Sequence, residues 1–273
     1  MWKSVVAGLW LLSIIAVAAA KPLILSAPPR ENLEKGIEQY QPIADFLTNL
    51  LGKPVEYQHP DSWLSYQRDM RADKYDIVFD GPHFVSWRIK HLGHNALIKL
   101  PGKLQFYLVS HKNDPDIKTS NDLIGKRIYG ILPPNLSTLS ILAHFSNPVR
   151  QPIIRGIRGG MWKVYAAFKQ DQNSAAIFRT TFYSKKLTQE DRQQMNILYT
   201  SEPLTNQAIT VSKRINKAQQ KKIRYGLLKT KGGRMALKRI LKRFGGKAKG
   251  FISASNSDYK GDNFLLEGVI FGW

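Results

Sequence analysis

Apolar residues recur along the first third of the chain with two alternating periods. Short apolar runs typical of buried strands lie at residues 21–27, 55–57 and 75–80. Between them, apolar positions at helical spacing predict helices at residues 37–51 and 61–72. Gly52 is the expected stop of the first helix, and Asp61 or Ser62 is the expected N-cap of the second. This alternation is typical of a mostly parallel sheet covered by helices.

The middle of the chain repeats the alternation, and the last third is mainly helical. Strands are predicted at residues 104–111, 127–132, 152–155 and 174–178, and helices at residues 137–145 and 160–170. The pattern then predicts one strand at residues 206–212 and two closing helices at residues 217–228 and 234–244. The chain is therefore expected to be an α/β protein built from two units.

The join between the two units contains no Gly/Ser-rich or Pro-rich tether. We expect extended crossings near residues 108–113 and 200–206. Lobe one would then be formed by residues 21–110 and 205–273, and lobe two by residues 111–204. Two lobes joined by two crossings make a hinge, and a small ligand would bind in the cleft between them.

The first twenty residues predict a secretory signal peptide at residues 1–20. Lys3 gives a basic start, an apolar run follows, and three alanines stand before Lys21, the expected first residue after cleavage. The alternative is an uncleaved membrane anchor, but the run is shorter than the roughly 20 residues that a spanning helix needs. The chain has no cysteine, which excludes a lipid-anchored cysteine and disulfides. We therefore expect a soluble periplasmic protein.

The charge is strongly basic and unevenly distributed. The chain has 41 Lys and Arg against 20 Asp and Glu, and residues 203–256 hold fifteen of the basic residues and no acidic one. Such a stretch attracts polyanions such as anionic lipid headgroups or lipopolysaccharide, and export argues against nucleic acid. The alternative is a solvated basic face with no dedicated partner.

Four motifs occur in order along the chain: YQPIADFL at residues 40–47, LGKPV at 51–55, YDIVFDGP at 75–82 and SNDLIGK at 120–126. Together they resemble the phosphate/phosphonate-binding family of periplasmic substrate-binding proteins of ABC transporters, over about residues 21–260. The resemblance implies a type II periplasmic-binding-protein fold with the ligand between the lobes. It also implies that the protein binds phosphonates, phosphate-like anions or other small polar compounds, performs no chemistry and docks on a membrane permease.

Ligands of open α/β sheets lie beyond the carboxyl ends of the strands, at helix N-termini. Residues 27–31, which include Arg30, follow the first strand. Residues 132–138 begin a helix whose free N–H groups favour an oxyanion, and Asn135, Ser137 and Thr138 lie there. The resemblance places a serine-rich binding turn at Ser137 and Thr138. The alternative for these residues is an ordinary N-cap.

The segment YDIVFDGPHFVSW (residues 75–87) ends a strand in Asp80 and a Gly-Pro turn. The resemblance implies a cleft-facing side chain after this turn, which makes His83 and Phe84 candidates. Trp87 is expected in the core of the following helix. Asp80 either caps the turn or supplies an acid to the site.

The segment at residues 155–162 departs from the family pattern. Where relatives have a Gly-Ser-His turn this chain has Gly-Gly-Met-Trp at residues 159–162, and the later Asp-Ala pair is absent at residues 173–176. An aminoalkyl phosphonate needs an acid for its ammonium group, so these losses argue against that ligand. Arg155 and Arg158 flank the turn and can pair with an anion bidentately, whereas Arg179 and Tyr183 are weaker candidates.

Other chemistry finds little support in the sequence. His91 and His94 have i, i+3 spacing, but the chain has six scattered histidines and no cysteine, too few ligands to predict a metal. No catalytic or nucleotide-binding motif is present, so we expect neither an enzyme nor a cofactor.

The leading expectation is a monomeric periplasmic solute-binding protein that captures a small anion for an ABC importer. The alternatives are a ligand-sensing adaptor of the same fold that acts with a membrane kinase, and a basic envelope protein that binds polyanions.

Overall fold

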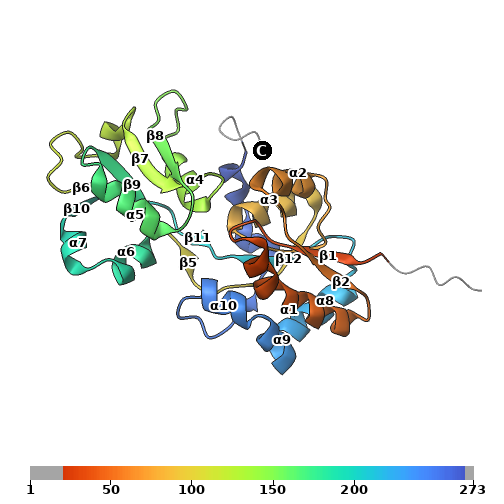
Figure 1. Cartoon of the computed structure of the whole chain (residues 1–273). Coiled ribbons are helices and arrows are strands. Elements are labelled where there is room, and N and C mark those ends of the chain that lie inside the picture. Colours follow the sequence, from red (N-terminus) through yellow and green to blue (C-terminus); the bar gives the residue numbers. More distant parts are fainter. Residues whose placement is uncertain (1–20, 268–273) are drawn as a thin grey trace, which may run out of the picture.

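The computed structural model describes residues 21–267, so the signal peptide predicted at residues 1–20 lies outside the described part. The chain forms two lobes, each built on one sheet (Figure 1). The sheet of lobe one has the order β13-β4-β12-β3-β1-β2 and that of lobe two the order β10-β6-β9-β7-β8. The two-lobe α/β architecture predicted from the sequence is confirmed.

The strands of lobe one are β1 (Leu23–Ser26), β2 (Val55–Gln58), β3 (Ile77–Asp80), β4 (Asn95–Lys99), β12 (Ala208–Val211) and β13 (Ile252–Ser253). The strands of lobe two are β6 (Phe106–His111), β7 (Arg127–Ile131), β8 (Ile153–Ile157), β9 (Ser174–Arg179) and β10 (Met195–Thr200). β1 is parallel to β2 and β3, and β7 is parallel to β8 and β9. The strands that enter from the crossings, β12 and β6, are antiparallel to their neighbours.

Helices cover both sheets. Lobe one has α1 (Leu33–Leu51), α2 (Trp63–Arg71), α3 (Pro82–Leu92), α8 (Lys217–Lys229), α9 (Lys231–Ala236) and α10 (Lys238–Phe244). Lobe two has α4 (Leu136–Leu142), α5 (Met161–Gln170), α6 (Thr180–Lys186) and α7 (Gln189–Gln193). Residues 21–267 also form the 3₁₀ turns η1 (Ser120–Leu123), η2 (Asn256–Tyr259) and η3 (Asp262–Leu265). Among the described residues, none of the helices has the length and apolar character needed to cross a membrane.

The local signals in the sequence set the ends of several helices. Gly52 ends α1 with φ of 64°, a left-handed conformation that favours glycine, and the Ser62 side chain caps α2. The helix predicted at residues 234–244 is different in the structure, where it is divided between α9 and α10. The division lies at Leu237, whose ψ of −9° departs from the α-helical value of about −42°.

The first crossing between the lobes lies earlier than expected. β5 (Lys103–Leu104) and β11 (Leu204–Thr205) pair antiparallel and form the two crossings. β6 pairs along its whole length in the sheet of lobe two, from Phe106 opposite Arg179 onward. The crossing predicted near residues 108–113 is therefore at 103–104, and residues 106–110, which were expected in lobe one, belong to the sheet of lobe two.

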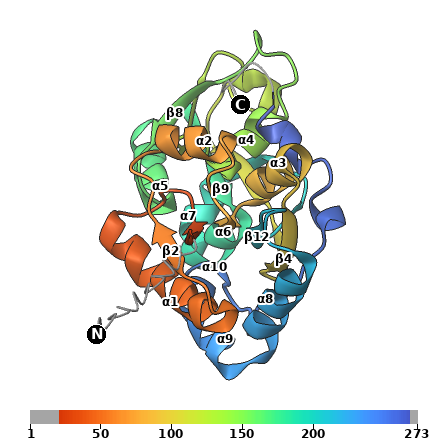
Figure 2. The same cartoon turned by 90° about the vertical axis from the view of Figure 1, so that its right-hand side faces the viewer.

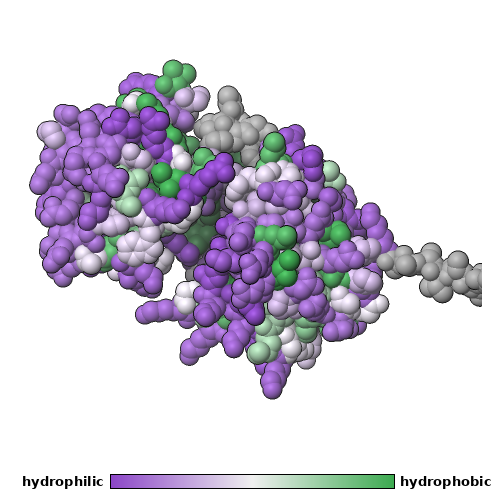
Figure 3. Space-filling view, viewed as in Figure 1, coloured by the Kyte–Doolittle hydropathy of each residue, from purple (hydrophilic) through white to green (hydrophobic). Residues whose placement is uncertain are grey.

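An apolar cluster joins the lobes on one side of the hinge. Phe84 and Trp87 of α3 belong to the same buried cluster as Leu136 and Leu139 of α4 and Leu265 of η3. Trp87 thus lies in the core, as predicted. Because α3 and α4 belong to different lobes, this cluster holds the lobes against each other beside the crossings. The space-filling view shows a hollow between the lobes (Figure 3).

Candidate ligand-binding cleft

A cavity of about 980 Å³ lies between the lobes. Its walls come from loops that follow β1 and β2 in lobe one and β7 and β8 in lobe two, together with Arg243 of α10. The lining includes residues 29–33, His59, 61–64, 131–133, Asn135 and 157–160. β1 is parallel to β2 and β7 is parallel to β8, so the cavity lies at the carboxyl ends of two parallel pairs, where α/β folds bind ligands.

Arg30 supplies a cation without a full set of partners. Its guanidinium carbon lies 6.0 Å from the ring centroid of Phe79 and 5.5 Å from that of Phe244. Two aromatic rings so placed hold the guanidinium in position. The Nη1 atom is buried and has no hydrogen-bond partner among the described residues. A buried donor without a partner is costly, so this atom is suited to an oxyanion brought by a ligand.

Glu31 places a carboxylate in the same cavity. Its side chain is only 2% exposed, and its Oε2 atom lies 2.8 Å from Nη2 of Arg243. The Oε1 atom is buried and has no hydrogen-bond partner among the described residues. The Tyr40 hydroxyl is also buried and unpartnered, and burial raises the pKa of Tyr40, so the hydroxyl stays protonated. The ion pair with Arg243 offsets the negative charge of Glu31 in this wall.

His59 and the start of α2 form the next part of the wall. Nδ1 of His59 lies 2.9 Å from the Tyr57 hydroxyl, and burial lowers the pKa of His59, which leaves the ring neutral at pH 7. A Cβ on Gly36 would lie 2.6 Å from that ring nitrogen, so this position needs glycine. At the rim, Ser62 caps α2 and Asp61 adds a second carboxylate.

The loop after β7 contributes Asn135 to the lining. The Asn135 side chain accepts hydrogen bonds from the Ser137 amide at 3.1 Å and from the Ser137 hydroxyl at 2.8 Å. The Thr138 hydroxyl donates to the Ile131 carbonyl at 2.6 Å. Both hydroxyl-bearing residues are fully buried and outside the lining. They hold the turn in place, and only Asn135 of the three predicted residues lines the cavity.

The two arginines predicted near β8 are placed differently. Arg158 follows the strand and lines the cavity. Arg155 is an exposed residue within β8, opposite Tyr129, and is not in the lining. The weaker candidates Arg179 and Tyr183 are also outside the lining.

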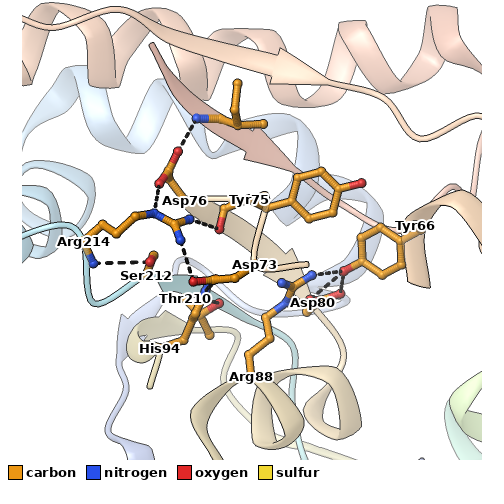
Figure 4. Close-up of polar contacts among 11 residues, drawn as sticks. Tyr66, Asp73, Tyr75, Asp76, Asp80, Arg88, His94, Thr210, Ser212 and Arg214 are labelled. Atoms are coloured by element: carbon orange, nitrogen blue, oxygen red, sulfur yellow. Dashed lines mark hydrogen bonds and ion pairs between the residues drawn. The ribbon is translucent and has the colours of Figure 1, made fainter. Parts of the chain in front are cut away.

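The strand end at residues 80–84 is buried rather than turned into the cavity. Asp80 accepts hydrogen bonds from the Tyr66 hydroxyl at 2.6 Å and from Nε of Arg88 at 2.9 Å, and both ion-pair partners are fully buried (Figure 4). Phe84 packs in the core and stacks on Trp63 at 6.2 Å. A buried carboxylate needs a charged partner, which Arg88 supplies from the same helix that Gly81 and Pro82 begin.

His83 links the lobes and does not line the cavity. It is 3% exposed, and its Nε2 atom lies 3.2 Å from the Pro134 carbonyl in lobe two. Burial lowers the pKa of His83 to about 3, so the ring is neutral and Nε2 can carry the donated hydrogen. His83, like Asp80 and Phe84, is outside the cavity lining.

The second polar network in Figure 4 lies at the amino end of β3, away from the cavity. Asp76 accepts from the Ile24 amide at 2.8 Å and from Nε of Arg214 at 2.9 Å, which ties β1 and β3 to the loop after β12. His94 lies 3.3 Å from Asp73, whereas His91 pairs with Glu267 at 2.7 Å. The two histidines therefore have separate partners, and no group of metal-ligating side chains forms among residues 21–267.

Comparisons with known proteins assign the chain to a family. A model of the family described as "ABC transporter, phosphonate, periplasmic substrate-binding protein" matches residues 25–259. No curated protein matches the sequence.

Similar solved structures share the fold at low identity. The Xanthomonas citri protein XAC2383 bound to ATP has a TM-score of 0.69 and 13% identity, over 89% of this chain and 94% of that chain. PhnD1 from Prochlorococcus marinus in complex with methylphosphonate has a TM-score of 0.61 and 15% identity, over 90% of this chain and 97% of that chain. A binding protein component of an ABC phosphonate transporter from Pseudomonas aeruginosa has a TM-score of 0.60 and 15% identity, over 90% of this chain and 85% of that chain.

The family match spans most of the chain. Members are substrate-binding proteins and not a class of enzymes. They act in the periplasm, together with a transporter in the membrane. The chain belongs to the family of periplasmic substrate-binding proteins of phosphonate ABC transporters.

Proposed function

We propose that the protein captures a small oxyanion of the phosphonate or phosphate class in the cleft and delivers it, as a monomer and without catalysis, to an ABC permease. The observation that carries the proposal is that Arg30 lines the cavity and that its buried Nη1 has no partner among the described residues. Export through cleavage of residues 1–20 belongs to the same proposal.

The charges in the lining fit this ligand class. Arg243 is engaged by Glu31, which leaves Arg30 in lobe one and Arg158 in lobe two. Closure of the hinge would bring both guanidinium groups to the ligand from opposite sides. An arginine binds phosphonate and phosphate oxygens with two parallel hydrogen bonds, which favours these anions over singly charged halides.

Titration calorimetry with phosphate, phosphite, methylphosphonate and ATP tests the proposal. We expect binding of at least one, and a loss of about tenfold or more in Arg30→Gln and Arg158→Gln, because a charged hydrogen bond contributes about 1.5–3 kcal/mol. Arg155→Gln is the matched control, because Arg155 lies within β8, the strand that Arg158 follows, and is outside the cavity lining; this variant should bind normally. Absence of binding by all four ligands would contradict the proposal.

A second candidate function is association with anionic lipid through the exposed side of α8, α9 and α10. Both views place α8 and α9 at the lower end of lobe one (Figures 1 and 2). Eight exposed cations there have no ion-pair partner among the described residues: Lys217, Lys221, Lys222, Lys229, Lys231, Arg234, Lys238 and Lys242. We call them the basic helical face.

The sequence positions concentrate this charge. Lys217, Lys221 and Lys229 recur at multiples of four residues on α8, whose opposite side buries Ile223 and Leu227. At α9, a Cβ on Gly233 would lie 2.0 Å from the Gly226 carbonyl oxygen, so α8 and α9 approach closely at this point. Each cation near an anionic bilayer contributes about 1 kcal/mol.

Co-sedimentation with vesicles that contain phosphatidylglycerol tests the second function. Binding should weaken with salt, and the triple variant Lys221→Gln, Lys222→Gln and Lys229→Gln should lose about tenfold or more in affinity. The control carries Lys163→Gln, Lys185→Gln and Lys186→Gln, three exposed lysines of lobe two. Equal loss in both triple variants would contradict a role for the basic helical face.

A further inference from the structure

The rim of the cleft carries three exposed leucines beside the polar residues Asp61 and Ser62. Three leucines in the cavity lining expose large parts of their side chains: Leu33 is 57% exposed, Leu64 75% and Leu132 38%. Single exposed leucines are common on protein surfaces and need no explanation. Three that line one cavity, from both lobes, form an apolar surface of the kind that marks ligand-binding grooves.

Two of these leucines lie in the first turns of helices and stay exposed there. Leu64 lies on the first turn of α2, whose buried residues are Tyr66, Asp69 and Met70, and it points away from that side. Leu33 precedes the first buried residue of α1. The exposed parts of the three leucine side chains can contact a ligand, and Trp63 lies beside them in the lining.

The arrangement of the cavity is amphiphilic. Arg30 is held over Phe79 and Phe244, so a polar wall lies at the end of β1, next to the leucines of the rim. The volume of about 980 Å³ is in the range of sites for drug-sized ligands, and a phosphate or methylphosphonate would leave most of it to water. A ligand with a charged head and an apolar body would contact both surfaces.

We propose that the ligand is an organic phosphonate or phosphate monoester with an apolar body of several carbon atoms. Its oxyanion pairs with Arg30 and Arg158, and its body packs on Leu33, Leu64, Leu132 and Trp63. This inference rests on the proposed oxyanion-binding function. The competing explanation is that the leucines of the two lobes pack on each other when the hinge closes, whatever the ligand.

Calorimetry with phosphate and with methyl-, butyl- and hexylphosphonate tests the inference. A methylene fully withdrawn from water strengthens binding about fourfold, so half burial gives about twofold for each one. Hexylphosphonate should then bind about thirtyfold more tightly than methylphosphonate. Equal affinity for the two would overturn the inference and leave the proposed function intact, whereas no binding by any ligand of the series would overturn both.

The variant Leu64→Ser separates contact with the ligand from closure of the lobes. We expect the ratio of hexyl- to methylphosphonate affinity to fall several-fold, with the affinity for methylphosphonate unchanged. Val149→Ser is the matched control, because Val149 is 89% exposed and lies outside the cavity lining. If Leu64→Ser weakens both ligands by the same factor, the leucine acts in lobe closure and the inference fails.

Discussion

Replacement of Asp80 tests whether the strand end at residues 80–84 serves the fold or the ligand. In the structure Asp80 and Arg88 are fully buried, and Nε of Arg88 lies 2.9 Å from Oδ2 of Asp80. The Tyr66 hydroxyl donates a hydrogen bond to Asp80 and accepts one from Arg88. Asp80→Ala removes the carboxylate and leaves the guanidinium of Arg88 buried without an anion. We therefore expect a large loss of stability and no direct effect on the ligand.

The magnitude follows from the burial of the pair. Loss of one partner of a buried ion pair costs about 3–5 kcal/mol, a large part of the 5–15 kcal/mol that stabilises a typical protein. Asp80→Asn keeps one acceptor oxygen and should cost less. The double variant Asp80→Leu with Arg88→Met removes both charges, so it should be more stable than Asp80→Ala, although the Tyr66 hydroxyl loses its partners.

Urea unfolding followed by circular dichroism measures the stability, and calorimetry at low temperature measures the affinity of the folded fraction. For a ligand that binds the wild type, Asp80→Asn should keep its affinity within about twofold, since a change outside the cavity lining leaves the contacts with the ligand in place. If this variant is as stable as the wild type but loses the ligand, Asp80 belongs to the binding site and the reasoning is refuted.

Two further predictions concern single residues elsewhere. Gly233→Ala should lower the free energy of unfolding in urea by at least about 2 kcal/mol, because the new Cβ would lie 2.0 Å from the Gly226 carbonyl oxygen. Gly232→Ala is the control and should lower it far less, because its Cβ would meet only the Phe46 ring at 3.2 Å. Equal effects of the two substitutions would contradict the close approach of α8 and α9. Burial raises the pKa of Asp262 to about 6, so the unfolded chain releases this proton at lower pH than the folded one, and stability should fall as pH rises from about 4 to 6. Asp262→Asn should remove that part of the pH dependence, and thermal unfolding of both proteins from pH 4 to pH 7 measures it; parallel curves would contradict the prediction.

The order of strands and helices was predictable because each depends on local spacing. The stop at Gly52 and the cap at Ser62 were predictable for the same reason. The position of the first crossing between the lobes was not predictable, because a strand buried on both faces has the same apolar pattern in either lobe. Only the pairing of β6 with β9 and β10 assigns residues 106–111 to lobe two.

For the cleft, the sequence predicted the loops better than the side chains within them. Strand ends that lead into helices identified the segments that hold Arg30, Asn135 and Arg158, all of which line the cavity. The direction of each side chain depends on its partner, and that information is tertiary. Asp80 is directed inward by Arg88. Arg243 reaches the cavity through α10, far along the chain, and no motif indicates it.

The polar residues near the cleft have two distinct roles, and the hydrogen bonds separate them. Ser137, Thr138 and Asp80 have their hydrogen-bonding atoms engaged by other protein groups, so they fix the shape of the loops. Arg30 Nη1 and Glu31 Oε1 are buried in the cavity wall without such partners among residues 21–267. Because protein structures rarely leave buried polar atoms unsatisfied, we expect these two atoms to be completed by the ligand. Arg30 needs an acceptor and Glu31 a donor. If the proposed function holds, we expect a phosphonate that accepts a hydrogen bond from Arg30 and donates one to Glu31, either from a singly protonated oxyanion or from a neighbouring group.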